Sequence, residues 1–112
     1  MANPDKELVG ASTSLLILSV LARESNYGYQ ILRRINEEAG GIFTWQEGTI
    51  YPVLHKMERD GLVRTQWQQA DTGRRRKYYY ITAKGRDALG AGAQQWGAFH
   101  GLVARMTEQA HG

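Results

Sequence analysis

The sequence predicts a mainly α-helical fold that carries one two-stranded β-hairpin. Val63 to Gln68 alternates apolar and polar residues, and Tyr78 to Ile81 is aromatic and β-branched, as half-buried strands are. Asp71-Thr72-Gly73 lies between these two segments and supplies a turn. On either side of the hairpin, apolar residues recur at helical spacing, which predicts three helices before it and one after it.

Size and composition limit the class of protein further. The chain has 112 residues, enough for one domain with one modest core, and 42% of them are apolar, as in globular proteins. It has no cysteine, which excludes disulfides, thiolate metal sites and cysteine nucleophiles. The longest apolar run, residues 15–22, is shorter than the ~20 residues of a membrane span. We therefore expect a cytoplasmic protein with no membrane partner and no cofactor.

The first two helices are expected at residues 8–23 and 27–39. The first is apolar around much of its circumference, which predicts that it is buried. For the second, Ser25-Asn26 offers an N-cap and Gly40-Gly41 offers a stop. Its apolar positions, which we expect in the core, are Tyr29, Leu32 and Ile35.

A third helix is expected at about residues 46–60, but two features disagree about where it begins. Thr44 and Glu47 have the spacing of a capping box, which favours a start just after Thr44. Pro52 favours a start near Glu47 or Gly48, or else a bend at the proline, because proline is tolerated without cost only in the first turn. The inward positions are Ile50, Val53, Leu54 and Met57.

Thr82 is expected to cap a final helix that runs to about Glu108, which corresponds to roughly 39 Å. This is longer than a small core can cover, so part of its apolar stripe should pack on another chain. We therefore divide the protein into residues 1–82 and a dimerisation helix, residues 83–112. The alternative is that the helix folds back and buries the stripe within its own chain. The stripe has heptad spacing and consists of Leu89, Trp96, Phe99, Val103 and Met106.

Four consecutive cations, Arg74-Arg75-Arg76-Lys77, follow the turn of the hairpin. The formal net charge is only +3, so this clustering, rather than the total, points to an anionic partner. Three helices followed by a basic hairpin describe a winged helix-turn-helix, in which the third helix enters the major groove and the hairpin, or wing, touches the backbone. The alternative is a solvated turn that is basic by chance.

Five motifs resemble the PadR family of bacterial transcriptional regulators over about residues 15–96. The length is similar to that of the short subfamily, whose members end after one long C-terminal helix. The motifs are Tyr27-Gly28-Tyr29, Glu47 to Pro52, Arg59 to Val63, Gly73 to Tyr79, and Thr82 to Gly85.

This resemblance implies a homodimeric repressor, not an enzyme, that binds a palindromic DNA operator and is released by a small molecule. It assigns DNA contacts to the start of the third helix, to the wing and to Tyr27, whose hydroxyl can meet a phosphate. On the third helix the residues are Gly48, Thr49, Tyr51, Pro52, His55 and Lys56, and on the wing they are Arg74, Arg75, Arg76 and Lys77.

The resemblance also implies a ligand site on the dimer seam, where a flat aromatic inducer stacks between the two copies of Trp96. Ala93 and Phe99 lie beside Trp96 on the same helix and would line the site. The alternative is that the two tryptophans only anchor the interface, as aromatic residues commonly do.

Three other classes of function fit the residues less well. A winged-helix module that binds only proteins would keep this fold but has no need for four cations on the wing. A metal site is not expected, because the three histidines lie on different elements and no cysteine can assist them. An enzyme is not expected either, because no serine has a histidine near it and no phosphate-binding glycine motif is present.

Overall fold

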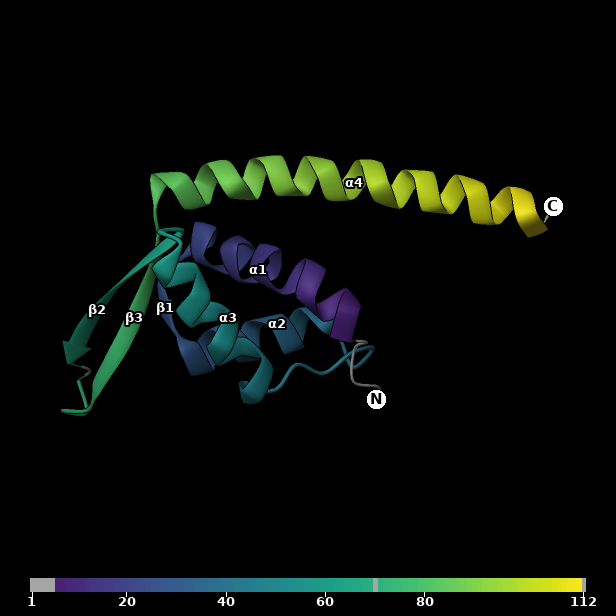
Figure 1. Ribbon diagram of the computed structural model, residues 1–112. Helices are drawn as coiled ribbons and strands as arrows, with labels where there is room; N and C mark the ends of the chain where they lie inside the picture. The colour runs from purple at the N-terminus through teal and green to yellow at the C-terminus, as the bar shows by residue number, and fades with distance from the viewer. Residues whose placement is uncertain (1–5, 70, 112) are drawn as a thin grey trace.

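A computed structural model describes residues 6–69 and 71–111 and confirms the predicted fold class (Figure 1). Helices dominate, the basic hairpin projects from one end, and one long helix runs past the rest of the molecule. The elements are α1 (Lys6–Arg23), β1 (Asn26–Tyr27), α2 (Gly28–Ala39), α3 (Glu47–Arg59), β2 (Val63–Gln69), β3 (Arg75–Ile81) and α4 (Ala83–His111).

The first three helices enclose the core, and the base of the hairpin closes one side of it. Each fully buried aliphatic side chain contributes about 1.5–3 kcal/mol, so this core is the main source of stability. Its members are Ile17, Leu18 and Leu21 of α1, Ile31, Leu32 and Ile35 of α2, Ile50, Leu54 and Met57 of α3, Val63 and Tyr79 of the hairpin, and Trp45. Of the four inward positions predicted on α3, only Val53 is partly exposed.

The turn between α2 and α3 is held by Asn36 and Trp45. The Asn36 amide donates to the Trp45 carbonyl oxygen at 3.0 Å, and its oxygen accepts from the Trp45 backbone N–H at 2.8 Å. The Trp45 indole N–H donates to the Thr13 hydroxyl at 3.3 Å. The hydrogen bonds between Asn36 and Trp45, together with the buried indole ring, therefore fix the position of α3 relative to α2.

The start of α2 differs from the prediction in two ways. Asn26 does not cap the helix, because Asn26 and Tyr27 form a third strand that pairs with Tyr79 and Tyr78 of β3. Tyr27 is the N-cap and makes no side-chain capping bond. The predicted core position of Tyr29 is also wrong, since its side chain is 50% exposed. The buried stripe begins at Gly28 and continues through the aliphatic residues of α2, which turns Tyr29 outward.

The start of α3 agrees with the later of the two predicted positions. The helix begins at Glu47, and its N-cap is Gln46 rather than Thr44. Pro52 nevertheless lies inside the helix, beyond the first turn. Since proline has no N–H, it removes the hydrogen bond that residue 52 would otherwise donate to the carbonyl of Gly48.

Helix α4 begins as predicted, with Thr82 as its cap. The backbone N–H of Gly85 donates to the Thr82 hydroxyl at 3.0 Å, and that hydroxyl donates to the carbonyl of Gly61 at 2.7 Å. Gly85 is necessary here, because a Cβ would collide with the carbonyl oxygen of Leu62. The start of α4 is thereby locked to the segment that joins α3 to β2.

Only the first half of α4 packs on the rest of the chain. Gly92 lies against α1, where a Cβ would come 2.6 Å from the Leu15 side chain. Beyond this point the helix continues into solvent, which gives the molecule its extents of 59 × 32 × 21 Å (Figure 1). The wing projects away from the same end at which α4 begins, so both elements leave the core from one junction.

Candidate nucleic-acid interface

The start of α2, the outward side of α3 and the wing surround one concave surface, here called the basic groove. Four consecutive cations and four tyrosines contribute to it. A groove with this charge and with hydroxyl donors can bind a phosphate backbone. It is lined by Tyr27, Gly28, Tyr29, Tyr51, His55, Trp67, Arg74, Arg75, Arg76, Lys77 and Tyr79.

The basic groove brings together many of the residues that the sequence assigned to DNA. Tyr27, Tyr51, His55 and the cations at 74–77 all line it. Tyr29 and Trp67 also line the groove and were not predicted from the sequence, although the phase of the apolar stripe on α2 and the position of Trp67 in the basic hairpin could have indicated them. The other predicted residues of α3 lie outside the lining, in exposed or half-exposed positions: Gly48, Thr49, Pro52 and Lys56.

Tyr51 is held against the start of α2 by the absence of a side chain at Gly28. A Cβ on Gly28 would lie 2.5 Å from Cε1 of the Tyr51 ring. Burial, with a smaller contribution from Glu47, raises the pKa of the Tyr51 hydroxyl. The hydroxyl therefore remains protonated at neutral pH and can donate a hydrogen bond to a phosphate oxygen.

The wing cations alternate between the two faces of the hairpin. Arg75 and Lys77 lie on the face that turns toward α3, and Arg76 lies on the other face. The Arg75 guanidinium stands 5.4 Å from the centre of the Trp67 ring, and that of Arg76 stands 4.2 Å from the centre of the Tyr27 ring. Such contacts are worth about 0.5–1 kcal/mol at exposed sites, so the rings orient both arginines without neutralising them.

Lys77 differs from the arginines because a carboxylate faces it. Its ammonium lies 3.3 Å from Oε1 of Glu58, in the last turn of α3, and the Thr65 hydroxyl donates to Oε2 of the same carboxylate at 2.8 Å. The hydrogen bond from Thr65 is the main cause that lowers the pKa of Glu58, and Lys77 adds to it. Glu58 is therefore ionised at neutral pH and is bound to both strands of the wing.

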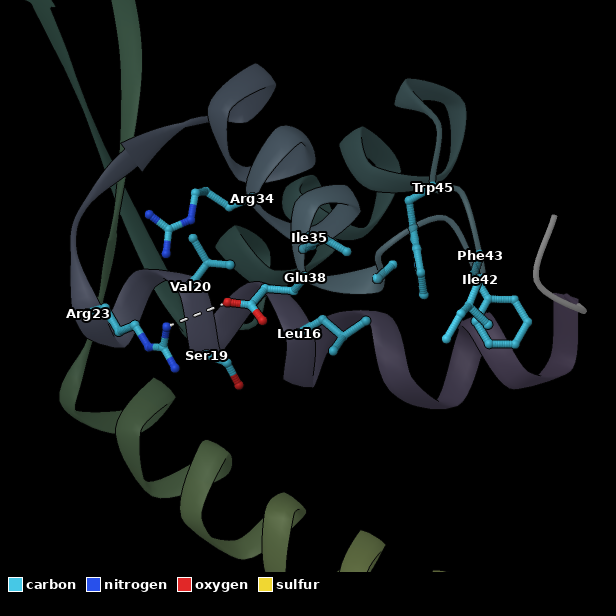
Figure 2. Close-up of a pocket in the computed structure, with 11 residues that line it drawn as sticks. Leu16, Ser19, Val20, Arg23, Arg34, Ile35, Glu38, Ile42, Phe43 and Trp45 are labelled. Carbon is cyan, nitrogen blue, oxygen red and sulfur yellow. Dashed lines mark ion pairs between the residues drawn. The ribbon is translucent and has the colours of Figure 1, made fainter. Parts of the chain in front are cut away.

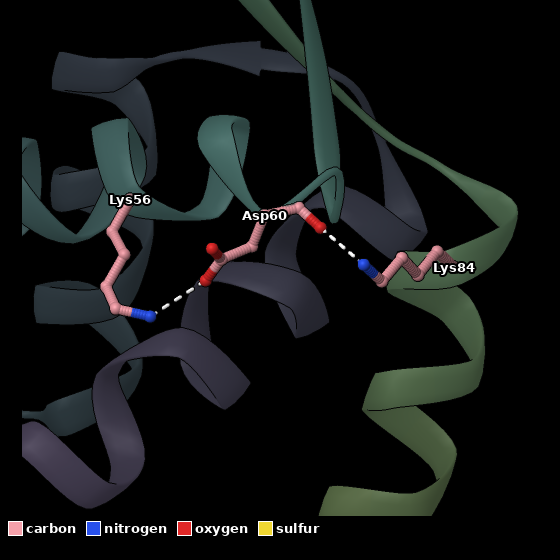
Figure 3. A network of polar contacts seen from close by, with 3 residues as sticks. All are labelled: Lys56, Asp60 and Lys84. Carbon is pink, nitrogen blue, oxygen red and sulfur yellow. Dashed lines mark hydrogen bonds and ion pairs between the residues drawn. The ribbon is translucent and has the colours of Figure 1, made fainter.

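A second carboxylate lies at the other side of α3. Lys56 donates to Oδ2 of Asp60 at 2.8 Å, and Lys84 of α4 donates to the backbone carbonyl of Asp60 at 2.7 Å (Figure 3). The hydrogen bond from Lys56 is the main cause that lowers the pKa of Asp60. Both side chains of the Lys56–Asp60 pair are exposed. Exposed pairs are weak, so Lys56 can leave Asp60 to reach a phosphate.

The predicted dimer seam is apolar and largely uncovered within the chain. Trp96 is 37% exposed and Phe99 is 61% exposed, and Val103 and Met106 lie farther along the same stripe. Leu102, which the heptad pattern did not include, is exposed beside them. Leu89 differs from the rest because it packs against the chain's own core. Ala93, proposed beside the ligand, is exposed.

An open apolar cleft that the sequence did not predict lies between α1, α2 and the turn that follows α2 (Figure 2). Arg23 and Glu38 face each other across its rim at 3.9 Å. Ile42 at its edge is 71% exposed. The cleft is lined by Leu16, Ser19, Val20, Arg23, Arg34, Ile35, Glu38, Ala39, Ile42, Phe43 and Trp45.

The described residues hold neither a cluster of metal ligands nor a helix that could cross a membrane. Within 6–69 and 71–111, no three histidine, aspartate or glutamate side chains gather as metal ligands would. In the same part of the chain, no helix combines the length and the hydropathy that crossing a membrane requires.

The three-helix core, the basic wing and the groove between them define a winged-helix protein of the class that regulates transcription. Residues 17–91 match the family described as Transcriptional regulator PadR-like family, and the chain belongs to that family. The resemblance seen in the sequence is thus confirmed. Members of this family are DNA-binding regulators and not enzymes.

Individual relatives agree with this assignment. The transcriptional regulator Rv3488 of Mycobacterium tuberculosis is 32% identical over 84 residues, which are 75% of each chain. A PadR family transcription regulator from Clostridium difficile is 31% identical, with a TM-score of 0.75 over 84% of this chain and 96% of its own. A PadR-like transcriptional regulator from Bacillus cereus is 29% identical, with a TM-score of 0.79 over 91% and 97%.

Proposed function

We propose that this protein is a homodimeric repressor that binds an operator in double-stranded DNA through the basic groove and the outward side of α3. The observation that carries the proposal is the convergence of the wing cations with Tyr51 and His55 of α3 in one groove. None of the residues that line the basic groove is acidic, and the neighbouring Glu58 is paired with Lys77. We further propose that the protein works in the cytoplasm, where such an operator would be.

The contacts divide into two kinds. Arg74, Arg75 and Arg76 would bind phosphates or a narrow minor groove, and the hydroxyls of Tyr27 and Tyr51 would add phosphate contacts. The family resemblance implies a contact of the same kind for Lys77. On α3, Thr49 and Pro52 can touch a thymine methyl group, and Gly48, His55 and Lys56 lie beside them. This is a small set for reading bases, so DNA shape and phosphate contacts would carry much of the affinity.

The second half of α4 would form the dimer. Its stripe of Trp96, Phe99, Val103 and Met106 has few partners within the chain, and the neighbouring Leu102 enlarges it. Burying such a stripe against a second copy supplies a driving force for association. A twofold dimer would present two α3 helices to successive major grooves, about 34–36 Å apart, and this spacing favours a palindromic operator.

A flat aromatic inducer between the two copies of Trp96 completes the proposal. Trp96 is partly exposed, and Ala93, which lies one turn before it, adds little bulk beside the ring. A ligand that stacks there would change how the two α4 helices meet, and α4 begins at the junction that also ends α3. Ligand binding could thereby alter the distance between the two α3 helices.

Selection of duplexes from a random pool, followed by binding assays at two salt concentrations, tests the DNA-binding function. We expect enrichment of a palindrome and an affinity that falls steeply with salt. Recovery of no sequence, with no binding to any duplex at low salt, would favour a winged-helix module that binds only proteins. Sedimentation at micromolar concentration tests the dimer separately.

A further inference from the structure

We propose that Glu58 is a positioning residue that sets the angle of the wing against α3, and that Lys77 serves as its partner rather than as a DNA contact. This inference rests on the proposed DNA-binding function. It changes the role of one of the four wing cations and gives a role to a carboxylate that the DNA-binding surface would otherwise be expected to avoid.

The geometry joins one carboxylate of α3 to both strands of the wing. Oε2 of Glu58 accepts from Thr65 of β2 at 2.8 Å, and Oε1 faces Lys77 of β3 at 3.3 Å. Thr65 pairs with Tyr79, and Lys77 lies two residues before Tyr79 on the same strand and pairs with Trp67. Side chains two residues apart in a strand point to the same face, so Thr65 and Lys77 lie on one face of the hairpin. A single carboxylate thus spans the strands and holds both to the last turn of α3.

The position of this contact along the hairpin matters as much as its chemistry. The base of the wing is anchored in the core by Val63 and Tyr79, whereas residues 71–75 at the tip are exposed. The Glu58 carboxylate binds the hairpin between its buried base and its exposed tip. On the opposite face, the Tyr27 ring supports Arg76 and meets the Tyr78 ring edge to face at a centroid distance of 5.6 Å. The wing is therefore held from both faces where it leaves the core.

Lys77 has a different role from the wing arginines because its charge is paired with a carboxylate. The side chains of Lys77 and Glu58 are 31% and 37% exposed, so this pair lies partly out of solvent. At the distance of a bound phosphate, their opposite charges largely cancel. Arg75 and Arg76 face aromatic rings, which leave their charges available. The wing therefore offers three effective cations at its tip, and the fourth is used to hold the hairpin.

A preset angle favours sequence discrimination over affinity. Wing cations on a free hairpin could find phosphates on any duplex, while a held wing meets its phosphates only when α3 lies in register with the bases. Loss of the Glu58 carboxylate would free the wing, release Lys77 and remove one negative charge from the surface. Non-specific binding should then become tighter, and the preference for the operator should fall.

Three variants separate positioning from charge. Glu58→Gln removes the carboxylate charge, and Thr65→Val removes only the hydroxyl donor while keeping the branched shape. Lys77→Met removes the cation. Glu37→Gln is the control, because Glu37 is an exposed carboxylate of α2 that does not line the basic groove. Binding to the selected operator and to a scrambled duplex is measured over a range of salt, with melting curves to show that each variant is folded.

We expect Glu58→Gln to bind the scrambled duplex more tightly, with a salt slope steeper by about one unit, and to lower the operator-to-scrambled ratio roughly tenfold. Thr65→Val should lower the ratio without steepening the slope by a full unit. Lys77→Met should leave the slope close to that of the wild type, and Glu37→Gln should change neither quantity.

Two results would overturn the inference while leaving the proposed function intact. One is a wild type that discriminates and a Glu58→Gln variant that discriminates equally well. The other is a Lys77→Met variant whose slope falls by a full unit, as expected for a phosphate contact. A wild type that binds no duplex would instead reject the proposed function and this inference with it.

Discussion

Gly28 of α2 and Tyr51 of α3 approach so closely that no side chain fits between them. A Cβ on Gly28 would lie 2.5 Å from Cε1 of Tyr51 and 2.9 Å from its hydroxyl oxygen. This one contact joins two helices and points the Tyr51 side chain into the basic groove. It also gives a physical reason for glycine in the Tyr27-Gly28-Tyr29 motif, at a helical position where glycine is otherwise unfavourable.

Replacing Gly28 by alanine should destabilise the fold by about 1–3 kcal/mol, because the added methyl group must displace the Tyr51 ring. Chemical unfolding measures the change. Gly90→Ala is the matched control, since Gly90 lies in α4 with nothing within 4 Å of a Cβ, and it should stabilise by about 0.5–1 kcal/mol. A neutral Gly28→Ala variant would show that Tyr51 has room to move.

Arg75→Ala should weaken operator binding and make its dependence on salt shallower by about one unit, because one phosphate contact is lost. Titrations at several salt concentrations give the slope. Arg33, an exposed cation on α2 paired with Glu37 and outside the basic groove, supplies the control variant Arg33→Ala. Equal slopes for the wild type and for a full series of wing alanines would reject the assignment of the wing to DNA.

The contribution of Glu58 to stability should depend on pH. Its pKa is lower in the folded protein than the ordinary value of a glutamate, so the ionised carboxylate stabilises the fold at pH values above that ordinary pKa. The stabilisation is lost as the pH falls through the lowered folded pKa. Glu58→Gln should therefore cost about 0.5–1 kcal/mol at pH 7 and less at an acidic pH below the ordinary pKa of a glutamate, as measured by urea unfolding at both pH values. The same loss at both pH values would contradict this account.

A negative charge on the exposed stripe of α4 should dissociate the dimer. Val103→Asp would place a carboxylate in an apolar interface, where desolvation opposes association. Sedimentation at micromolar concentration should give a dimer for the wild type and a monomer for this variant. Gln94→Asp, on the opposite side of the same helix and exposed, is the control and should stay dimeric. A monomeric wild type would remove the basis of the proposed operator geometry.

Flat aromatic dyes should quench tryptophan fluorescence if they stack between the two copies of Trp96. Trp45 and Trp67 also emit, and Trp67 is exposed on the wing, so the Trp96→Ala variant is the necessary control. Quenching by the dye should be lost in that variant. Quenching that persists without Trp96 would move the ligand elsewhere, and absence of quenching in the wild type would leave Trp96 as an interface anchor only.

Local patterns in the sequence were sufficient for much of the fold. The hairpin followed from alternation and a glycine turn, and the start of α4 followed from Thr82, because both depend on residues that are close along the chain. Residues near the start of α3 do not decide between its two possible first residues, since capping-box spacing and proline placement favour different positions. The contacts of Trp45 with Asn36 and Thr13 help to hold the turn that leads into α3.

The cations at residues 74–77 of the candidate site could be identified from the sequence, but the groups that surround each of them could not. Which ring or carboxylate faces each cation depends on strand register and on where α3 ends. The assignment of Tyr29 to the core failed for a related reason, since a shift of one position in the helical stripe moves a side chain by about 100°.

The sequence by itself determined the order of the elements, the basic tip of the wing and the family. Only the tertiary structure decided that Asn26 and Tyr27 would pair with β3, that Tyr29 would face the groove, and that Glu58 would meet Thr65 and Lys77. The physical reason is the separation along the chain of the residues that interact. Turns and caps are decided by neighbours in the chain, whereas strand pairing, close packing at glycine and ion pairs between elements arise only when distant segments are brought together by the core.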